Sequence, residues 1–285
     1  MRVWLSVDME GISGLVRWAD VIAKGMDFQR NRGFMTQDAN AVIAGAFDAG
    51  ATEVVVEENH GVEDLCDLVL DEIDPRCSVV RGAGRPTATT MAGLTTQTGV
   101  VLFVGHHARA GSFPGIMAHT VSYERFREVR IAGAPVGESE IMTIRAGELG
   151  VPAGLIAGDQ IVCAELSKRA PWIESVCVKR ALSNVSAEVI PPERTRELIY
   201  SGAKRAVTRA LRGELPVYRD QPAPHEIEVE LRQPLEAQLR ENLESLPEFQ
   251  IAGDHVVRTE APDMDLGFRR IAYLSFGHGT KSTRY

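Results

Sequence analysis

The sequence has no cluster of positive charge and no long apolar run. Its 31 Lys and Arg residues are scattered and are outnumbered by 39 Asp and Glu residues, which gives a formal net charge of -8 at pH 7. A nucleic-acid binder needs a basic face to neutralise phosphates, so this balance argues against one. The first apolar run is interrupted by Asp8, too early for a signal peptide or a membrane span. We therefore expect a cytoplasmic protein that binds neither nucleic acid nor membrane.

Cysteine is also scarce, and the sequence contains no internal repeat or low-complexity segment. The four cysteines stand far apart and form no C-x-x-C pair. Cys163 and Cys177 lie in apolar settings, so we expect buried, reduced thiols rather than disulfides or metal ligands. With 44% hydrophobic and 25% charged residues, the composition is that of an ordinary globular protein. The length predicts one large domain, or one large and one small.

Strand and helix patterns alternate along the chain. Predicted strands span 2–7, 52–57, 78–81, 99–104, 151–157 and 175–180, and predicted helices span 36–49, 62–71, 87–94, 135–150, 161–168 and 191–213. This order predicts an α/β fold, with a mostly parallel sheet flanked by helices and joined by right-handed crossovers. Residues 120–132 suggest a hairpin, and Asn31-Arg32-Gly33 marks a break before a helix that Thr36 would cap.

The pattern changes after residue 213. The stretch 214–224 contains three prolines and is predicted to be a linker. Beyond it, strand patterns at 226–231 and 255–259 and helix patterns at 234–245 and 262–276 predict a smaller α+β unit. We therefore expect a catalytic domain at 1–213 and a small C-terminal unit at 225–285.

Two carboxylates follow the first strand directly. If the strand continued, Asp8 and Glu10 would point to the same side, with Cα atoms roughly 6.5 Å apart. The turn at 11–14 places them at a strand exit, the edge at which α/β sheets bind ligands. The alternative is structural, with Asp8 as a helix cap and Glu10 as a solvated turn residue.

Three further side chains that can bind a metal stand at comparable places. His60 and His107 follow the strands at 52–57 and 99–104, and Glu138 opens the helix after Pro135. Two tetrahedral zinc ions have eight coordination positions, of which these five side chains fill six if Asp8 bridges, leaving two for one bridging water or hydroxide. This number of ligands suits a hydrolase with two metal ions. Single histidines are nevertheless often satisfied polar residues or metal-free catalysts, and a carboxylate in the first turn of a helix often serves the helix dipole.

Six short motifs in order carry a resemblance to a known family. They are Ser6–Gly14 (SVDMEGISG), Asn59-His60, Gly105–Ala110 (GHHARA), Pro114–His119 (PGIMAH), Pro135–Glu138 (PVGE) and Ala157–Asp159 (AGD). Together they resemble the DppA-like D-aminopeptidase family of self-compartmentalising zinc metallopeptidases. The similarity runs from residue 1 to about residue 160 and continues weakly to the C-terminus.

The resemblance implies an aminopeptidase that releases N-terminal D-amino acids, such as D-Ala, from short peptides. It implies that two zinc ions per chain are held by Asp8, Glu10, His60, His107 and Glu138. It also implies that His119 is a catalytic residue outside the ligand set. A ring assembly, a decamer of two stacked pentamers, would enclose the sites, and the small C-terminal unit would then serve subunit packing.

Several alternatives stay open at this point. The residue before His107 is a second histidine, His106, so the ligand assignment depends on the Ala-Arg-Ala that follows. Arg109 can bind a substrate carboxylate or pair with a nearby acid, and His119 can be a buried structural residue. Ligands alone do not select the scissile bond, so a two-metal amidase or phosphoesterase, or a metal-stabilised assembly module without turnover, is also compatible with the sequence.

Overall fold

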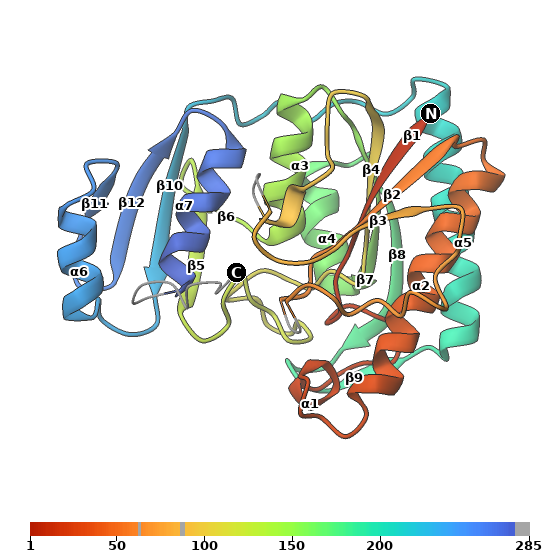
Figure 1. Cartoon of the computed structure of the whole chain (residues 1–285), viewed down its shortest axis with the longest axis horizontal. Coiled ribbons are helices and arrows are strands. Elements are labelled where there is room, and N and C mark those ends of the chain that lie inside the picture. Colours follow the sequence, from red (N-terminus) through yellow and green to blue (C-terminus); the bar gives the residue numbers. More distant parts are fainter. Residues whose placement is uncertain (62–63, 86–88, 277–285) are drawn as a thin grey trace.

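The computed structural model describes residues 1–61, 64–85 and 89–276, which form two sheets with helices packed against them (Figure 1). The strands of the first sheet are β1 (Arg2–Val7), β2 (Glu53–Glu58), β3 (Ser78–Val80), β4 (Thr98–Val104), β7 (Ala153–Asp159), β8 (Glu174–Ala181) and β9 (Ala187–Val189). The second sheet contains β5 (Phe126–Ile131), β6 (Ala134–Pro135), β10 (His225–Leu231), β11 (Phe249–Ile251) and β12 (Val256–Ala261). The helices are α1 (Trp18–Val21), α2 (Phe28–Asp48), the 3-10 turn η1 (Thr89–Met91), α3 (Glu138–Glu148), α4 (Gln160–Arg169), α5 (Pro192–Leu211), α6 (Ala237–Glu244) and α7 (Met264–Phe276).

The seven-stranded sheet has the order β3-β2-β1-β4-β7-β8-β9 and is parallel except at β9. The chain extends from β1 to β2 and β3 on one side, then returns to β4 and continues on the other side. The strand order therefore reverses between β1 and β4. In open α/β sheets, ligands bind outside the carboxyl ends of the strands at such a point. The mostly parallel α/β fold expected from the sequence is confirmed.

Alternate residues of β1 enter two different apolar cores. Val3 and Leu5 pack into the core that contains residues of α2 and α5, whereas Trp4 packs into the core that contains residues of α3 and α4. Helices thus cover both faces of the sheet, as Figure 1 shows. A strand buried on both faces needs apolar side chains at nearly every position, which explains the apolar run Val3–Leu5 of β1.

The second sheet, of order β11-β12-β10-β5-β6, is antiparallel and joins distant parts of the chain. β5 pairs with β10, with Val129 opposite Val229. The core that lies under α3 continues into this sheet through side chains of β5, β10 and α7. The division into units at 1–213 and 225–285 stays a prediction; the antiparallel sheet takes two of its strands, β5 and β6, from the first of them.

Some local predictions are wrong for identifiable reasons. α2 begins at Phe28, so the expected break at 31–33 is helical, with the Asn31 amide donating to the Asp20 carbonyl at 2.8 Å. Residues 64–71 of the helix predicted at 62–71 form turns, because Asp64 and Leu65 have positive φ angles of 55° and 61°. Only η1 forms within the described part of 87–94. Residues 62–63 and 87–88 lie outside the described residues.

Two further features concern the cysteines and the helices. All four cysteines are free, but Cys177 is exposed rather than buried, which corrects the expectation for that thiol. Among the described helices, none is long and apolar enough to span a membrane.

Candidate metal centre

Two glycines allow the segments after β1 and β4 to cross in contact. The Asp8 amide donates to the Val104 carbonyl at 3.0 Å, and the Gly11 amide donates to the Gly105 carbonyl at 2.6 Å. A Cβ on Gly11 would lie 2.0 Å from the carbonyl oxygen of His106, and a Cβ on Gly105 would lie 2.1 Å from that of Asp8. Gly105 also has a φ of +76°, in the left-handed region. The turn that carries the first carboxylates is therefore held directly against the turn that carries His107.

The first group of converging side chains contains Asp8, His107 and Glu138, and all three are buried. The Nε2 atom of His107 lies 3.5 Å from Oδ2 of Asp8 and 3.3 Å from Oε1 of Glu138. One ligand atom from each residue lies within 4.8 Å of the others. Carboxylate oxygens and imidazole nitrogens are ligands that zinc prefers in proteins.

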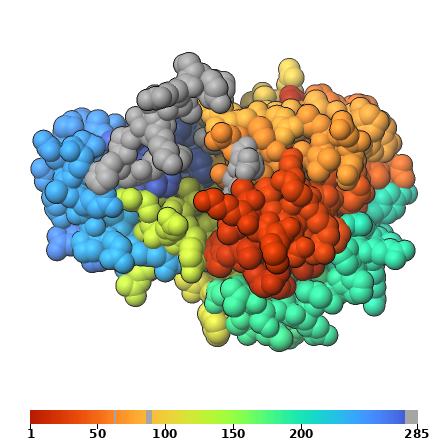
Figure 2. Space-filling model, turned by 60° about the horizontal axis from the view of Figure 1, so that its bottom comes forward, coloured from red at the N-terminus to blue at the C-terminus, as the bar shows by residue number. Residues whose placement is uncertain are grey.

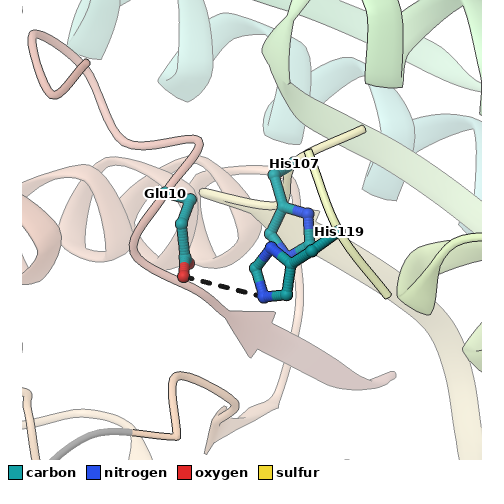
Figure 3. A group of neighbouring side chains, drawn as sticks. All are labelled: Glu10, His107 and His119. Carbon is teal, nitrogen blue, oxygen red and sulfur yellow. Dashed lines mark ion pairs between the residues drawn. The ribbon is translucent and has the colours of Figure 1, made fainter. Parts of the chain in front are cut away.

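A second group shares His107 and adds Glu10 and His119 (Figure 3). The Nε2 atom of His119 lies 3.9 Å from Oε1 of Glu10 and 3.9 Å from Oε1 of Glu138. The rings of His107 and His119 stack, with centroids 3.8 Å apart and planes 8° apart. Among the described residues, the buried Oε2 atom of Glu10 has no hydrogen-bond partner. His119 therefore lies within ligand distance of the same centre, although the sequence placed it outside the ligand set.

His60 contacts the cluster only at Glu10, and it belongs to neither of the two groups of three residues. Its Nε2 atom lies 3.7 Å from Oε1 of Glu10, while its Nδ1 atom lies 2.8 Å from Oδ2 of Asp67. The structure thus brings all five predicted ligands to one edge of the sheet, next to the reversal of strand order between β1 and β4.

The three imidazoles are oriented in the same way. Nδ1 of His107 lies 3.0 Å from the Ala108 carbonyl, and Nδ1 of His119 lies 2.8 Å from the Met117 carbonyl. Since a carbonyl only accepts, these Nδ1 atoms carry a proton, and Nε2 is the ring atom that faces the carboxylates. The Asp67 carboxylate orients His60 equivalently. Such acceptor partners commonly fix the ring of a metal-binding histidine.

The electrostatics of the cluster also favour a cation. Burial raises the pKa of Asp8 above its usual range, and the neighbouring Glu10 carboxylate raises it further. Burial alone would raise the pKa of Glu10 too, but the surrounding imidazoles hold it at about 2. Burial would lower the pKa of His107, but the carboxylates around it, first Glu138, raise it to about 10. The buried carboxylates therefore demand a compensating positive charge, which a proton or a metal ion supplies.

Glu138 is the first residue of α3, but its carboxylate does not cap that helix. The Gly137 amide donates instead to Oε2 of Glu140 at 2.5 Å. Glu138 accepts from the Val121 amide at 2.8 Å and from Nδ2 of Asn59 at 3.0 Å. Asn59 also lies 3.4 Å from Oδ2 of Asp8. One amide thus contacts two of the predicted ligands.

The segment that carries His119 is held in an unusual backbone conformation. Met117 and Val121 have φ angles of 48° and 62°. For a β-branched residue such as valine, this left-handed region is rare and costs on the order of 1–3 kcal/mol. The His119 amide donates to the Ala108 carbonyl at 3.1 Å. The strain is therefore tied to the contacts that place His119 beside His107.

A buried lysine holds the turn that bears Glu10. The ammonium of Lys179, on β8, donates to the carbonyls of Glu10, Ile12 and Leu15 at 2.6, 2.9 and 2.5 Å. Only 1% of Lys179 is exposed, and burial lowers its pKa to about 8. A charged donor with three carbonyl acceptors rigidifies the turn between the sheet and the centre.

Sequence reasoning missed three residues that support the centre, namely Asn59, Asp67 and Lys179. Lys179 carried no clear signal, because the strand 174–181 mixes polar and apolar residues and the next residue, Arg180, is exposed. In the sequence, Asn59 was noted only as the neighbour of His60. Asp67 lies in an irregular segment, where no helix or strand pattern predicts the position of its side chain.

The two remaining candidates do not join the cluster. His106 lies behind Asp8, with Nδ1 3.8 Å from Oδ2 of Asp8 and Nε2 3.1 Å from the Ser6 hydroxyl. Burial lowers the pKa of His106 to about 4. Arg109 points elsewhere, because its guanidinium lies 3.6 Å from both Glu128 and Glu165.

Comparison with known proteins agrees with this geometry. The chain is 33% identical over 199 residues to a D-aminopeptidase from Bacillus subtilis (strain 168), an alignment covering 70% of this chain and 71% of the relative. The fold matches a solved structure described as the Zn-dependent D-aminopeptidase DppA from Bacillus subtilis, a self-compartmentalizing protease. That match has a TM-score of 0.87 and 27% identity and covers 100% of both chains. The profile of peptidase family M55, D-aminopeptidase, matches residues 1–272, so the chain belongs to the D-aminopeptidase family and is a peptidase.

Proposed function

We propose that this peptidase is a zinc-dependent aminopeptidase that releases N-terminal D-amino acids, such as D-Ala, from short peptides. One observation carries the proposal: Asp8, His107 and Glu138 converge in a buried cluster at the reversal of strand order, in a chain of the D-aminopeptidase family. The solved relative of the same fold is described as zinc-dependent. The donor set and the unpartnered Oε2 atom of Glu10 suit such an ion.

The proposed ligands of two zinc ions are Asp8, Glu10, His60, His107 and Glu138. Asp8 is the proposed bridge, since its carboxylate lies 3.5 Å from Nε2 of His107 and also interacts with the Glu10 carboxylate. When bound, zinc supplies an activated water and polarises the scissile carbonyl.

The protein's own groups move protons and limit the access of water. His119, with Nδ1 bonded to the Met117 carbonyl, presents Nε2 to the cluster and can carry a proton to the amine that leaves. Trp18 packs edge-on against the His119 ring with centroids 5.5 Å apart, which limits the access of water to that side.

Hydrolysis of p-nitroanilides tests the proposed activity. We expect purified protein to cleave D-Ala p-nitroanilide faster than the L-Ala compound, to lose activity with a zinc chelator and to regain it when zinc is added. Activity on neither anilide, with zinc bound, would exclude the aminopeptidase. Cleavage of p-nitrophenyl phosphate alone would indicate the phosphoesterase alternative instead.

His119→Ala separates a catalytic role from a ligand role. If His119 transfers a proton, the variant should retain its zinc and lose about 10²–10⁴-fold in kcat. Metal analysis by plasma mass spectrometry and steady-state kinetics on the same preparation check this. His255→Ala, near the antiparallel sheet, is the control. Loss of zinc from His119→Ala would make His119 a ligand, and unchanged kcat would remove it from the mechanism.

The assembly is also a proposal. The solved relative is described as self-compartmentalizing, and we propose a ring decamer of two stacked pentamers for this chain, with a cytoplasmic location. Size-exclusion chromatography with light scattering should give a particle of about ten 31.1 kDa subunits. A monomer at micromolar concentration would contradict the proposal.

A further inference from the structure

A pocket lies next to the segment that carries His119. Its volume is about 360 Å³, and Met117 and Ala118, which directly precede His119, line it together with Trp18, Tyr123 and Arg232. These residues come from three distant parts of the chain. In Figure 2 the red N-terminal segment, the yellow-green segment around residue 120 and the blue C-terminal part adjoin one another on one face. The proposed roles of the centre leave this pocket without a function.

A continuous row of ring contacts leads from the metal centre to this pocket. The ring of His119 stacks on His107 and contacts Trp18 edge-on. The rings of Trp18 and Tyr123 have centroids 4.3 Å apart, and the guanidinium of Arg232 lies 5.1 Å from the Tyr123 centroid. The pocket is thus apolar and aromatic on the side of His119, with a cation at its other end.

Arg232 has no carboxylate partner among the described residues. Its Nε donates to the Tyr123 carbonyl at 2.8 Å, which fixes the side chain, while its Nη groups have no hydrogen-bond acceptor in the described part of the chain. Nearby arginines are paired: Arg125 lies 3.5 Å from Glu236, and Arg127 lies 3.5 Å from Glu230. In a chain with a net charge of -8, an oriented but unpaired arginine beside a catalytic centre suggests an acidic ligand.

We infer that this pocket binds the part of the peptide downstream of the scissile bond, and that Arg232 binds its C-terminal carboxylate. The inference rests on the proposed aminopeptidase function. A peptide carries one positive and one negative end. In an aminopeptidase the N-terminal residue lies at the centre, so the rest of the peptide extends away from it, and its C-terminal carboxylate suits Arg232.

The same arrangement favours short substrates. Each residue of an extended peptide adds about 3.3–3.6 Å, so only a peptide of a few residues can place its amine at the centre and its carboxylate at Arg232 simultaneously. The exposed ring of Phe113, on the rim of the pocket, offers further apolar contact for the downstream residue. Free acids should therefore be better substrates than the corresponding amides.

Matched peptides test this assignment. The substrates are D-alanyl peptides of two, three and four residues, each as the free acid and as the C-terminal amide, with D-Ala p-nitroanilide as the carboxylate-free reference. In the unaltered protein, kcat/KM should favour the acid over the amide. In Arg232→Gln that preference should fall about three- to tenfold, mainly through KM, as expected for loss of one partly exposed charge pair. Arg232→Lys should keep part of it, and Arg127→Gln should keep all of it.

Three results would overturn the assignment. They are an unchanged acid preference in Arg232→Gln, an equal loss on acids, amides and the p-nitroanilide, and a changed particle size that assigns Arg232 to a subunit contact. Failure of the unaltered protein to cleave any D-alanyl compound would instead refute the proposed function, so the two failures are distinguishable.

Discussion

Asp8→Ala is expected to empty both proposed zinc positions together and to abolish the peptidase activity. Asp8 lies 3.5 Å from the metal-facing nitrogen of His107, and its pKa is governed by burial and by the neighbouring Glu10. If Asp8 bridges as proposed, its loss would take a ligand from both ions and leave their charge less neutralised in a buried site, which is electrostatically costly. Even partners that only orient a ligand change metal affinity 10–100-fold, so we expect a loss greater than about 100-fold.

Three comparison variants make this test specific. His60→Ala and Glu138→Ala should each weaken mainly one ion. Asp38→Asn alters another buried carboxylate, one that accepts from the Ser13 amide at 2.9 Å, and should retain both. Plasma mass spectrometry on the dialysed proteins measures the metal content. Two zinc ions per chain retained in Asp8→Ala would refute the bridging assignment.

Lys179→Met is expected to lower the free energy of unfolding by about 3 kcal/mol or more. The methionine fills a similar volume but leaves three buried carbonyls, those of Glu10, Ile12 and Leu15, without their donor. Each unsatisfied buried acceptor costs about 1–3 kcal/mol. Because one of these carbonyls belongs to Glu10, zinc affinity should fall as well.

Urea denaturation of the zinc-free proteins measures the stability, and titration against a chelating dye measures the affinity. Lys204→Met on α5 is the matched control, since Lys204 is exposed and should change the free energy of unfolding by less than about 0.5 kcal/mol. Equal stabilities for the two variants would show that the three hydrogen bonds contribute little to the fold.

The polar residues at the ends of the parallel strands were the part of this protein that its sequence predicted best. β1 and β4 are mostly apolar, and the polar residues that follow them stand at the reversal of strand order because parallel strands end at the same edge. That reasoning placed Asp8 and His107 in one site. The predicted end of the first strand at residue 7 is confirmed, so Asp8 and Glu10 lie in the turn after β1, where strand alternation does not set their directions.

Contacts between residues far apart in the sequence determine the features that the sequence did not predict. Thr36 was expected to start a helix but lies inside α2, where its hydroxyl donates to Arg32 and accepts from the Val69 amide. Asp67 and Arg232 acquire their roles only through contacts across the fold. Local pattern carries no information about such contacts, because they depend on residues far away in the sequence.

The shared antiparallel sheet also imposes an order on folding during synthesis. β5 is complete at Ile131, but its partner β10 begins only at His225. At 5–20 residues per second, the ribosome makes the intervening stretch in roughly 5–20 s. During that interval β5 has an open edge and exposes Phe126, Val129 and Ile131, which are buried in the finished protein. The nascent chain is therefore most vulnerable to aggregation through β5, in the seconds before its C-terminal quarter emerges.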